Sequence, residues 1–284
     1  MKEKIRIVEV GPRDGLQNEP NIIPTDVKVA FIDALSEAGF EEIEAGAFVS
    51  PKWVPQMADS DEVFRRIRRK QGVRYSALVP NEKGLERALE VKVDKIAVFT
   101  AASETFNLKN INATIEESLN RLRPVVSNSP VPVRGYVSTA FVCPYEGKIS
   151  PSRVIPVVKE LLEMGCEEIS IGDTIGKATT EDVRTLLEEV SKVCSFEKIA
   201  LHFHDTYGGA VKNALVGAEM GVRVFDASAG GIGGCPYAPG APGNVATEDL
   251  VRAFPGRTGI DLEKLAAASQ IVRGYVSEKR VKAQ

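Results

Sequence analysis

Short runs of apolar and β-branched residues alternate with longer amphipathic stretches along the chain. The short runs predict eight strands, at 5–10, 42–47, 75–79, 95–99, 133–137, 168–172, 199–204 and 224–228. Between them, apolar residues recur every three to four positions and predict helices, among them 27–38, 61–69, 115–126, 154–164, 182–193 and 210–220. This alternation is typical of parallel βα units.

The positions of glycine support the same interpretation. Gly39, Gly165 and Gly221 each follow a predicted helix and precede the next strand, as glycines that end helices do. Eight βα units can close into a ring, so we predict an α/β fold, a TIM (β/α)8 barrel, with an extra helix at 262–282. A chain of 284 residues is also long enough for two domains, but no linker-like tract interrupts it. We therefore expect a single catalytic domain over 1–284.

Composition narrows the class of protein. The chain is 43% hydrophobic, and its 36 basic and 39 acidic residues are interspersed, which argues against nucleic acid or a membrane surface as a partner. No apolar run approaches the ~20 residues of a membrane span, and the charged start resembles no signal peptide, so we expect a cytoplasmic protein. Its four cysteines form no C-x-x-C pair, which argues against a disulfide framework or a zinc ribbon.

Polar residues collect where the predicted strands end. In a TIM barrel the carboxyl ends of the strands form the face that carries the active site. The polar residues expected on that face include Arg13, Asp14, Glu44, Asp173, His202 and His204, together with Ser103, Glu104, Ser138, Thr139, Thr174 and Asp205.

The two histidines of the chain lie two positions apart on one predicted strand. Side chains alternate along a strand, so His202 and His204 point to the same side and can reach one ion. Asp14 follows another odd-numbered strand and is the natural third ligand, because two neutral imidazoles need a carboxylate to offset a divalent charge. The alternative is a pair of strand histidines that only form hydrogen bonds.

Arg13 and the glycine-rich segment 230–235 each have two interpretations. Beside a metal, a permanently charged guanidinium can stabilise a developing oxyanion, but Arg-Asp-Gly is also a common solvated turn. The glycine segment is no dinucleotide fingerprint, because Pro236 stands where the last glycine belongs. Cys235 is either a thiol that exchanges protons above the rim or an incidental cysteine in a flexible loop.

Several long motifs together resemble one family. They are Val8–Asn18, Phe48–Met57, Arg134–Ser138, Cys143–Pro151, Gly172–Gly176, His202–Gly208 and Gly233–Pro236 with Ala241–Asn244. On these motifs the chain resembles the hydroxymethylglutaryl-CoA lyases, within a larger group of metal-dependent acyl-CoA lyases and synthases that have a TIM barrel. The resemblance covers nearly the whole chain.

The resemblance implies cleavage of 3-hydroxy-3-methylglutaryl-CoA to acetyl-CoA and acetoacetate by a homodimer that uses Mg²⁺ or Mn²⁺. Position by position, it implies a metal held by Asp14, His202, His204 and Asn244. It also implies that Arg13 stabilises the enolate and that Cys235 is an acid/base on a mobile loop, with Asp173 and Glu44 completing the site. Either Asp173 or His202 takes the hydroxyl proton.

Three other functions remain open. One is a lyase for a related 3-hydroxyacyl-CoA, and a second is a Claisen-type synthase. The synthases of the group typically carry R-D-G-E-Q, where this chain has Leu16 before Gln17, and they lack the Cys-Pro of the last loop. The third is a non-catalytic barrel that binds a CoA metabolite, which metal content and turnover would distinguish.

Overall fold

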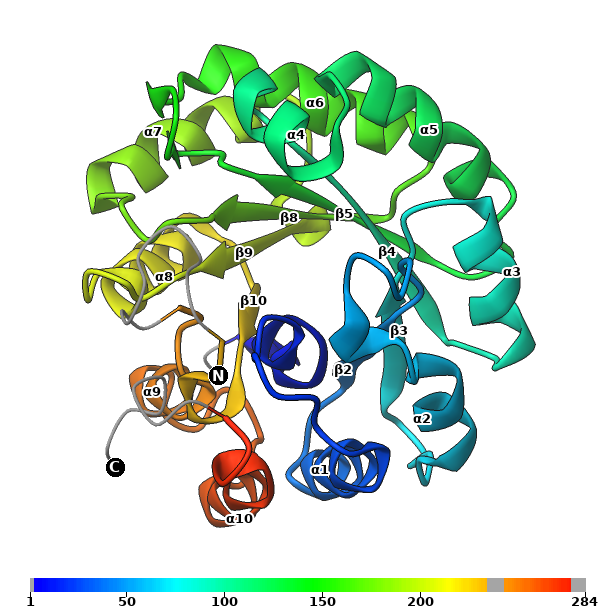
Figure 1. Ribbon diagram of the computed structural model, residues 1–284. Helices are drawn as coiled ribbons and strands as arrows, with labels where there is room; N and C mark the ends of the chain where they lie inside the picture. The colour runs from blue at the N-terminus through cyan, green and yellow to red at the C-terminus, as the bar shows by residue number, and fades with distance from the viewer. Residues whose placement is uncertain (1–2, 234–242, 277–284) are drawn as a thin grey trace.

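Eight parallel strands close into a barrel in the computed structural model, which describes residues 3–233 and 243–276 (Figure 1). Around the barrel their order is β1-β10-β9-β8-β5-β4-β3-β2. Their bounds are β1 Arg6–Glu9, β2 Glu42–Ala47, β3 Arg74–Leu78, β4 Lys95–Ala101, β5 Val133–Ser138, β8 Glu168–Asp173, β9 Ile199–Phe203 and β10 Val224–Ala227. The predicted TIM barrel is confirmed, and each of the eight strands overlaps its predicted range. A two-stranded hairpin, β6 Val142–Cys143 with β7 Gly147–Lys148, follows β5.

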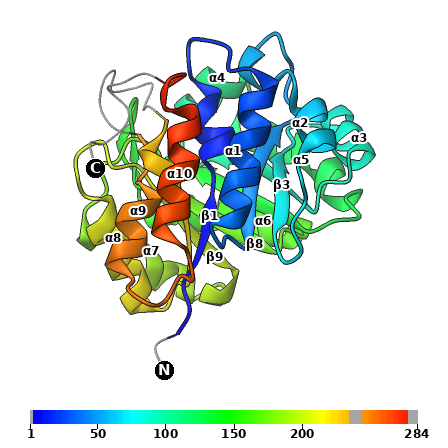
Figure 2. The same ribbon diagram turned by 90° about the horizontal axis from the view of Figure 1, so that it is seen from below.

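Helices surround the barrel (Figure 1). Their bounds are α1 Thr25–Glu37, α2 Ser60–Arg66, α3 Glu82–Glu90, α4 Glu104–Ile111, α5 Ile115–Ser127, α6 Pro151–Met164, α7 Thr180–Ser191, α8 Ala210–Met220, α9 Thr247–Ala253 and α10 Leu262–Arg273. The extra helix α10 packs between α1 and α9, and Figure 2 shows it alongside α1. It begins at the predicted residue and ends at Arg273, while 277–282 of the predicted range lie outside the described residues. Among the described helices, none combines the length and apolar character that a membrane crossing requires.

Local sequence signals define many of the helix ends. Thr114 and Thr179 each accept the backbone N–H three residues on, and Glu117 and Asp182 return the bond in a capping box. At the other end, Gly165 and Gly221 take left-handed backbone conformations, with φ of 112° and 119°. These glycines end α6 and α8 as predicted.

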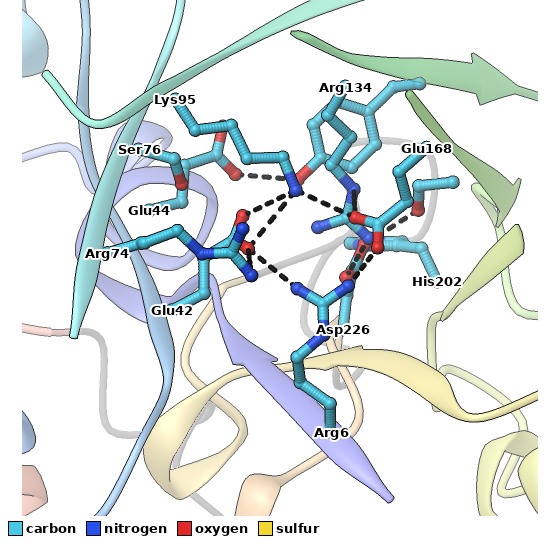
Figure 3. A network of polar contacts seen from close by, with 12 residues as sticks. Arg6, Glu42, Glu44, Arg74, Ser76, Lys95, Arg134, Glu168, His202 and Asp226 are labelled. Atoms are coloured by element: carbon cyan, nitrogen blue, oxygen red, sulfur yellow. Dashed lines mark hydrogen bonds and ion pairs between the residues drawn. The ribbon is translucent and has the colours of Figure 1, made fainter. Parts of the chain in front are cut away.

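The barrel interior carries paired charges where such barrels usually hold bulky apolar side chains. The apolar core lies mainly between strands and helices, and a small separate cluster consists of Val8, Val10, Ala200 and Val224. The charged residues inside the barrel are Arg6, Glu42, Lys95, Arg134, Glu168 and Asp226 (Figure 3). Lys95 Nζ, for example, lies 3.1 Å from Glu42 Oε1 and 3.0 Å from Glu168 Oε1. Each buried charge thus has an opposite partner, which offsets the cost of removing it from water.

Candidate metal centre and active site

Asp14, His202 and His204 meet at the C-terminal end of the barrel. Asp14 lies in a π-helical turn, Gly11–Gly15, that follows β1 directly, while His202 lies in β9 and His204 just beyond it. One potential ligand atom from each of the three residues lies within 4.8 Å of the others. The barrel brings the ends of β1 and β9 together because only β10 separates them in the sheet.

Asn244 joins these three residues from the segment that precedes α9. Its Nδ2 donates to Asp14 Oδ2 at 2.9 Å, and its backbone forms an antiparallel bridge with His204. Gly233 lies against it, where φ is +111° and an added Cβ would lie 2.7 Å from Asn244 Nδ2. A glycine is therefore required for this approach.

Two buried polar atoms of this cluster have no hydrogen-bond partner among the described residues. They are Oδ1 of Asn244 and Nδ1 of His204. Buried polar groups are ordinarily satisfied, so these two atoms call for a further partner. With the carboxylate of Asp14 and the imidazole of His202, the donor set is oxygen and nitrogen, which fits a divalent cation such as Mg²⁺ or Mn²⁺.

The electrostatic environment favours the protonation states that a metal requires at Asp14 and His204, but not at His202. Burial acts to raise the pKa of Asp14, but the charges of Arg13 and the two histidines lower it to about 2. Burial and the neighbouring His202 lower the pKa of His204 to about 4. The pKa of His202 is raised, because its hydrogen bond to Asp226 and the charge of Asp14 outweigh the effect of burial. A cation therefore competes with a proton mainly at His202.

Arg13 lies between the metal cluster and the barrel interior. Its Nη1 donates to Asp14 Oδ1 at 2.6 Å, its Nη2 donates to Glu44 Oε2 at 2.9 Å, and its guanidinium lies 5.5 Å from the centre of the Tyr136 ring. Tyr136 also donates to Glu44 Oε2, at 2.8 Å. Arg13 is only 6% exposed, which excludes the solvated-turn interpretation. Glu44 thus holds the guanidinium in place.

Asp173 and Cys235 differ from the other predicted site residues in their placement. The carboxylate of Asp173, at the end of β8, accepts the backbone N–H groups of Lys177 and Ala178 at 3.1 and 3.0 Å. Burial raises its pKa to about 6 despite these bonds. Asp173 is not among the residues that line the cavity beside the metal cluster. Cys235 lies outside the described residues.

A cavity of about 220 Å³ opens beside Arg13, Asp14 and the histidines. Gln17 and Tyr136 contribute to its lining, and the buried Oε1 of Gln17 has no partner among the described residues. Sequence reasoning did not assign either residue a place in the site, nor Asp226 beneath it. Gln17 and Tyr136 lie within motifs of the family resemblance, and Tyr136 and Asp226 lie at inward-facing strand positions, but neither signal distinguishes a site residue from a core residue.

Comparison with known proteins identifies the family. The profile of the HMGL-like family matches residues 4–272, nearly the whole chain. This chain belongs to the HMGL-like family. The family of lyases predicted from the motifs is confirmed by individual relatives.

Among the relatives of this HMGL-like chain is the rat 3-hydroxy-3-methylglutaryl-CoA lyase, cytoplasmic, which is 51% identical over 278 residues, 96% of this chain and 81% of the rat protein. The human hydroxymethylglutaryl-CoA lyase, mitochondrial, is 50% identical over 285 residues, 98% of this chain and 88% of the human protein. A solved structure of an HMG-CoA lyase from Acinetobacter baumannii, in complex with coenzyme A and 3-methylmalate, has a TM-score of 0.93 at 39% identity. The similarity covers 100% of this chain and 94% of that one.

Proposed function

We propose that the protein is a hydroxymethylglutaryl-CoA lyase, a carbon–carbon lyase that cleaves 3-hydroxy-3-methylglutaryl-CoA to acetyl-CoA and acetoacetate. The observation that carries the proposal is the cluster of Asp14, His202 and His204 beside Arg13 at the barrel rim. Relatives named for this activity share about half of its residues over nearly its whole length.

A divalent cation, Mg²⁺ or Mn²⁺, would be held by Asp14, His202, His204 and Asn244. Bound there, it supplies a Lewis acid that polarises the oxygens of the hydroxyacid portion of the substrate. Asp14 is ionised and His204 is neutral at pH 7, given pKa values of about 2 and 4. Both residues are thus ready to act as ligands without losing a proton first.

Arg13 stabilises the charge that develops on the thioester oxygen. When the C2–C3 bond breaks, its electron pair passes into the thioester and forms an enolate, while C3 becomes the ketone carbon of acetoacetate. The guanidinium is held by Glu44 and Asp14, its buried Nε has no partner among the described residues, and Arg13 lines the cavity. A donor fixed in advance needs no reorganisation during the reaction, and such donors contribute about 10²–10³ in rate.

Two protons move in this reaction. The C3 hydroxyl loses one to a base, for which Asp173 and His202 are the candidates. The pKa of Asp173 is raised to about 6, which suits a base, whereas His202 lines the cavity and its Nδ1 contacts Asp226. The other is donated to the enolate carbon and completes acetyl-CoA. We assign this donation to the thiol of Cys235.

One assay tests the proposed function. Purified protein is incubated with 3-hydroxy-3-methylglutaryl-CoA, and acetoacetate is measured with Mg²⁺, with Mn²⁺ and after treatment with a chelator. We expect release with either metal, loss on chelation and recovery when metal is returned. Release of no acetoacetate under any condition, or undiminished release after chelation, contradicts the proposal.

We further propose that the enzyme is a homodimer located in the cytoplasm. Relatives include one named as cytoplasmic and one named as mitochondrial, so the location needs its own test. Light scattering on the purified protein measures the mass of the assembly, with 30.7 kDa per chain, and fractionation of cells locates the protein.

A further inference from the structure

His202 rests on a buried carboxylate of the neighbouring strand. Asp226 lies opposite His202 in the register of β10 and β9, and its Oδ2 is 3.3 Å from His202 Nδ1. The ring of Tyr136 packs edge-on against the imidazole, with an interplanar angle of 86°. Asp226 is 1% exposed, so the contact is shielded from water. His204 differs, because its Nδ1 has no partner among the described residues.

Asp226 is itself fixed from two further sides. Arg134 Nη2 donates to its Oδ1 at 2.6 Å (Figure 3). Ser170 Oγ donates to its Oδ2 at 2.8 Å. Arg134 is anchored in turn by an ion pair with Glu168, Nε to Oε1 at 3.3 Å, and by the ring of Tyr136. A carboxylate paired with a guanidinium accepts hydrogen bonds and has no proton to donate. The proton in the contact with His202 therefore belongs to Nδ1 of the imidazole.

We propose that Asp226 is a positioning residue of the metal centre: it holds the Nδ1–H of His202, which leaves Nε2 as the nitrogen that faces the cation. Arg134 keeps Asp226 oriented for this task. Partners of this kind fix the tautomer and the ring orientation of metal-binding histidines, and their loss typically costs 10–100-fold in metal affinity. The inference rests on the proposed metal-dependent function, and it assigns the two histidines different environments within one site.

An Asp226→Asn variant tests the inference, with Glu42→Gln as the matched control. Each substitution removes one buried negative charge from the barrel interior, but Asp226 contacts Arg134 and His202, whereas Glu42 pairs with Arg6 and Lys95. In Asp226→Asn the amide oxygen remains the natural acceptor for Arg134, so the NH₂ group turns toward His202 and favours a proton on Nε2. Nε2 then no longer presents a free lone pair to the metal.

The first measurement is Mn²⁺ affinity, followed by electron paramagnetic resonance of the free ion. We expect Asp226→Asn to bind Mn²⁺ about 10–100-fold more weakly than wild type and Glu42→Gln to stay within a few-fold of wild type. Equal losses in the two variants, or none in Asp226→Asn, overturn the inference. If wild type itself binds no Mn²⁺, the proposed metal-dependent function fails. If wild type binds Mn²⁺ and the variants give one of the contrary results above, only the inference about Asp226 fails.

The second measurement uses only the wild-type side chain at 226 and therefore does not depend on how well the variant folds. The chain has two histidines, so ¹⁵N-histidine labelling yields ring signals from His202 and His204 alone. The spectrum of His204→Gln, in which His202 is the sole histidine, assigns them. With Mg²⁺ bound, we expect the ring proton of His202 on Nδ1. A proton on Nε2 overturns the inference.

Discussion

Replacing Arg13 by Gln separates charge stabilisation from metal binding. The guanidinium contacts Glu44 and Asp14 at 2.9 and 2.6 Å and is 6% exposed, so it is a fixed charge beside the cavity. Loss of such a donor typically costs about 10²–10³ in rate, or ~2.7–4 kcal/mol of transition-state stabilisation. We therefore expect kcat of Arg13→Gln to fall at least 100-fold.

Metal affinity should respond much less to the same substitution. The pKa of Asp14 is lowered by the two histidines and by the hydrogen bond from Asn244 as well as by Arg13, and these other contacts remain in Arg13→Gln. Mn²⁺ affinity of Arg13→Gln should therefore stay within a few-fold of wild type.

The matched variant is Arg13→Lys, which keeps the charge but cannot span the carboxylates of Asp14 and Glu44. Its kcat should therefore lie between those of wild type and Arg13→Gln. Thermal unfolding should show that each variant is folded at the assay temperature. Near-normal kcat in Arg13→Gln, or a loss of Mn²⁺ affinity as large as the loss of kcat, would refute the assignment of Arg13 to the enolate.

Three further predictions follow from the described contacts. With Asp173 as the base, whose pKa is raised to about 6, kcat should fall about tenfold per pH unit below pH 6. Asp173→Asn should lose this pH dependence together with ~10²-fold or more in kcat. A wild-type kcat that stays constant down to pH 5 excludes Asp173 as the base. Gly233→Ala should weaken Mn²⁺ binding at least tenfold, because the added Cβ would lie 2.7 Å from Asn244 Nδ2. An unchanged affinity in a Mn²⁺ titration contradicts this prediction. Burial raises the pKa of Glu9 from 4.5 to about 8, so the folded protein keeps a proton that the unfolded chain releases. The free energy of unfolding of wild type should therefore fall relative to that of Glu9→Gln, by up to ~1.4 kcal/mol per pH unit, as pH rises from 5 to 8. A difference between the two, measured by urea unfolding, that stays constant over this pH range contradicts the prediction.

Periodicity and helix-end signals were enough to predict the barrel. Strand ranges followed from short β-branched runs, and Gly165 and Gly221 marked the ends of α6 and α8. The helices α3, α4 and α9 were not among those named from the sequence. At eight and seven residues, α4 and α9 span only about two turns each, whereas α3 carries Leu85, Ala88 and Leu89 at helical spacing and could have been predicted from its pattern.

Only part of the candidate site could be predicted from the sequence. Alternation on one strand and proximity of strand ends suggested His202, His204 and Asp14 as neighbours, and the structure places their ligand atoms within 4.8 Å of one another. Asn244 came from the family resemblance, because it lies in a loop where no periodicity applies.

The charged interior of the barrel could not be predicted in the same way. Arg134 and Asp226 lie in different strands, 92 residues apart in sequence, and form their ion pair only when the barrel closes. A pattern of apolar and polar positions gives no pairing between such distant residues. The same reason explains why Asp226 beneath His202 was missed.

The most direct test of the account is a crystal structure grown with Mn²⁺ and measured for anomalous scattering. We expect one manganese peak per chain at the barrel rim, contacted by Asp14, His202, His204 and Asn244. An ion bound elsewhere, or these four side chains arranged without an ion at saturating Mn²⁺, would contradict it.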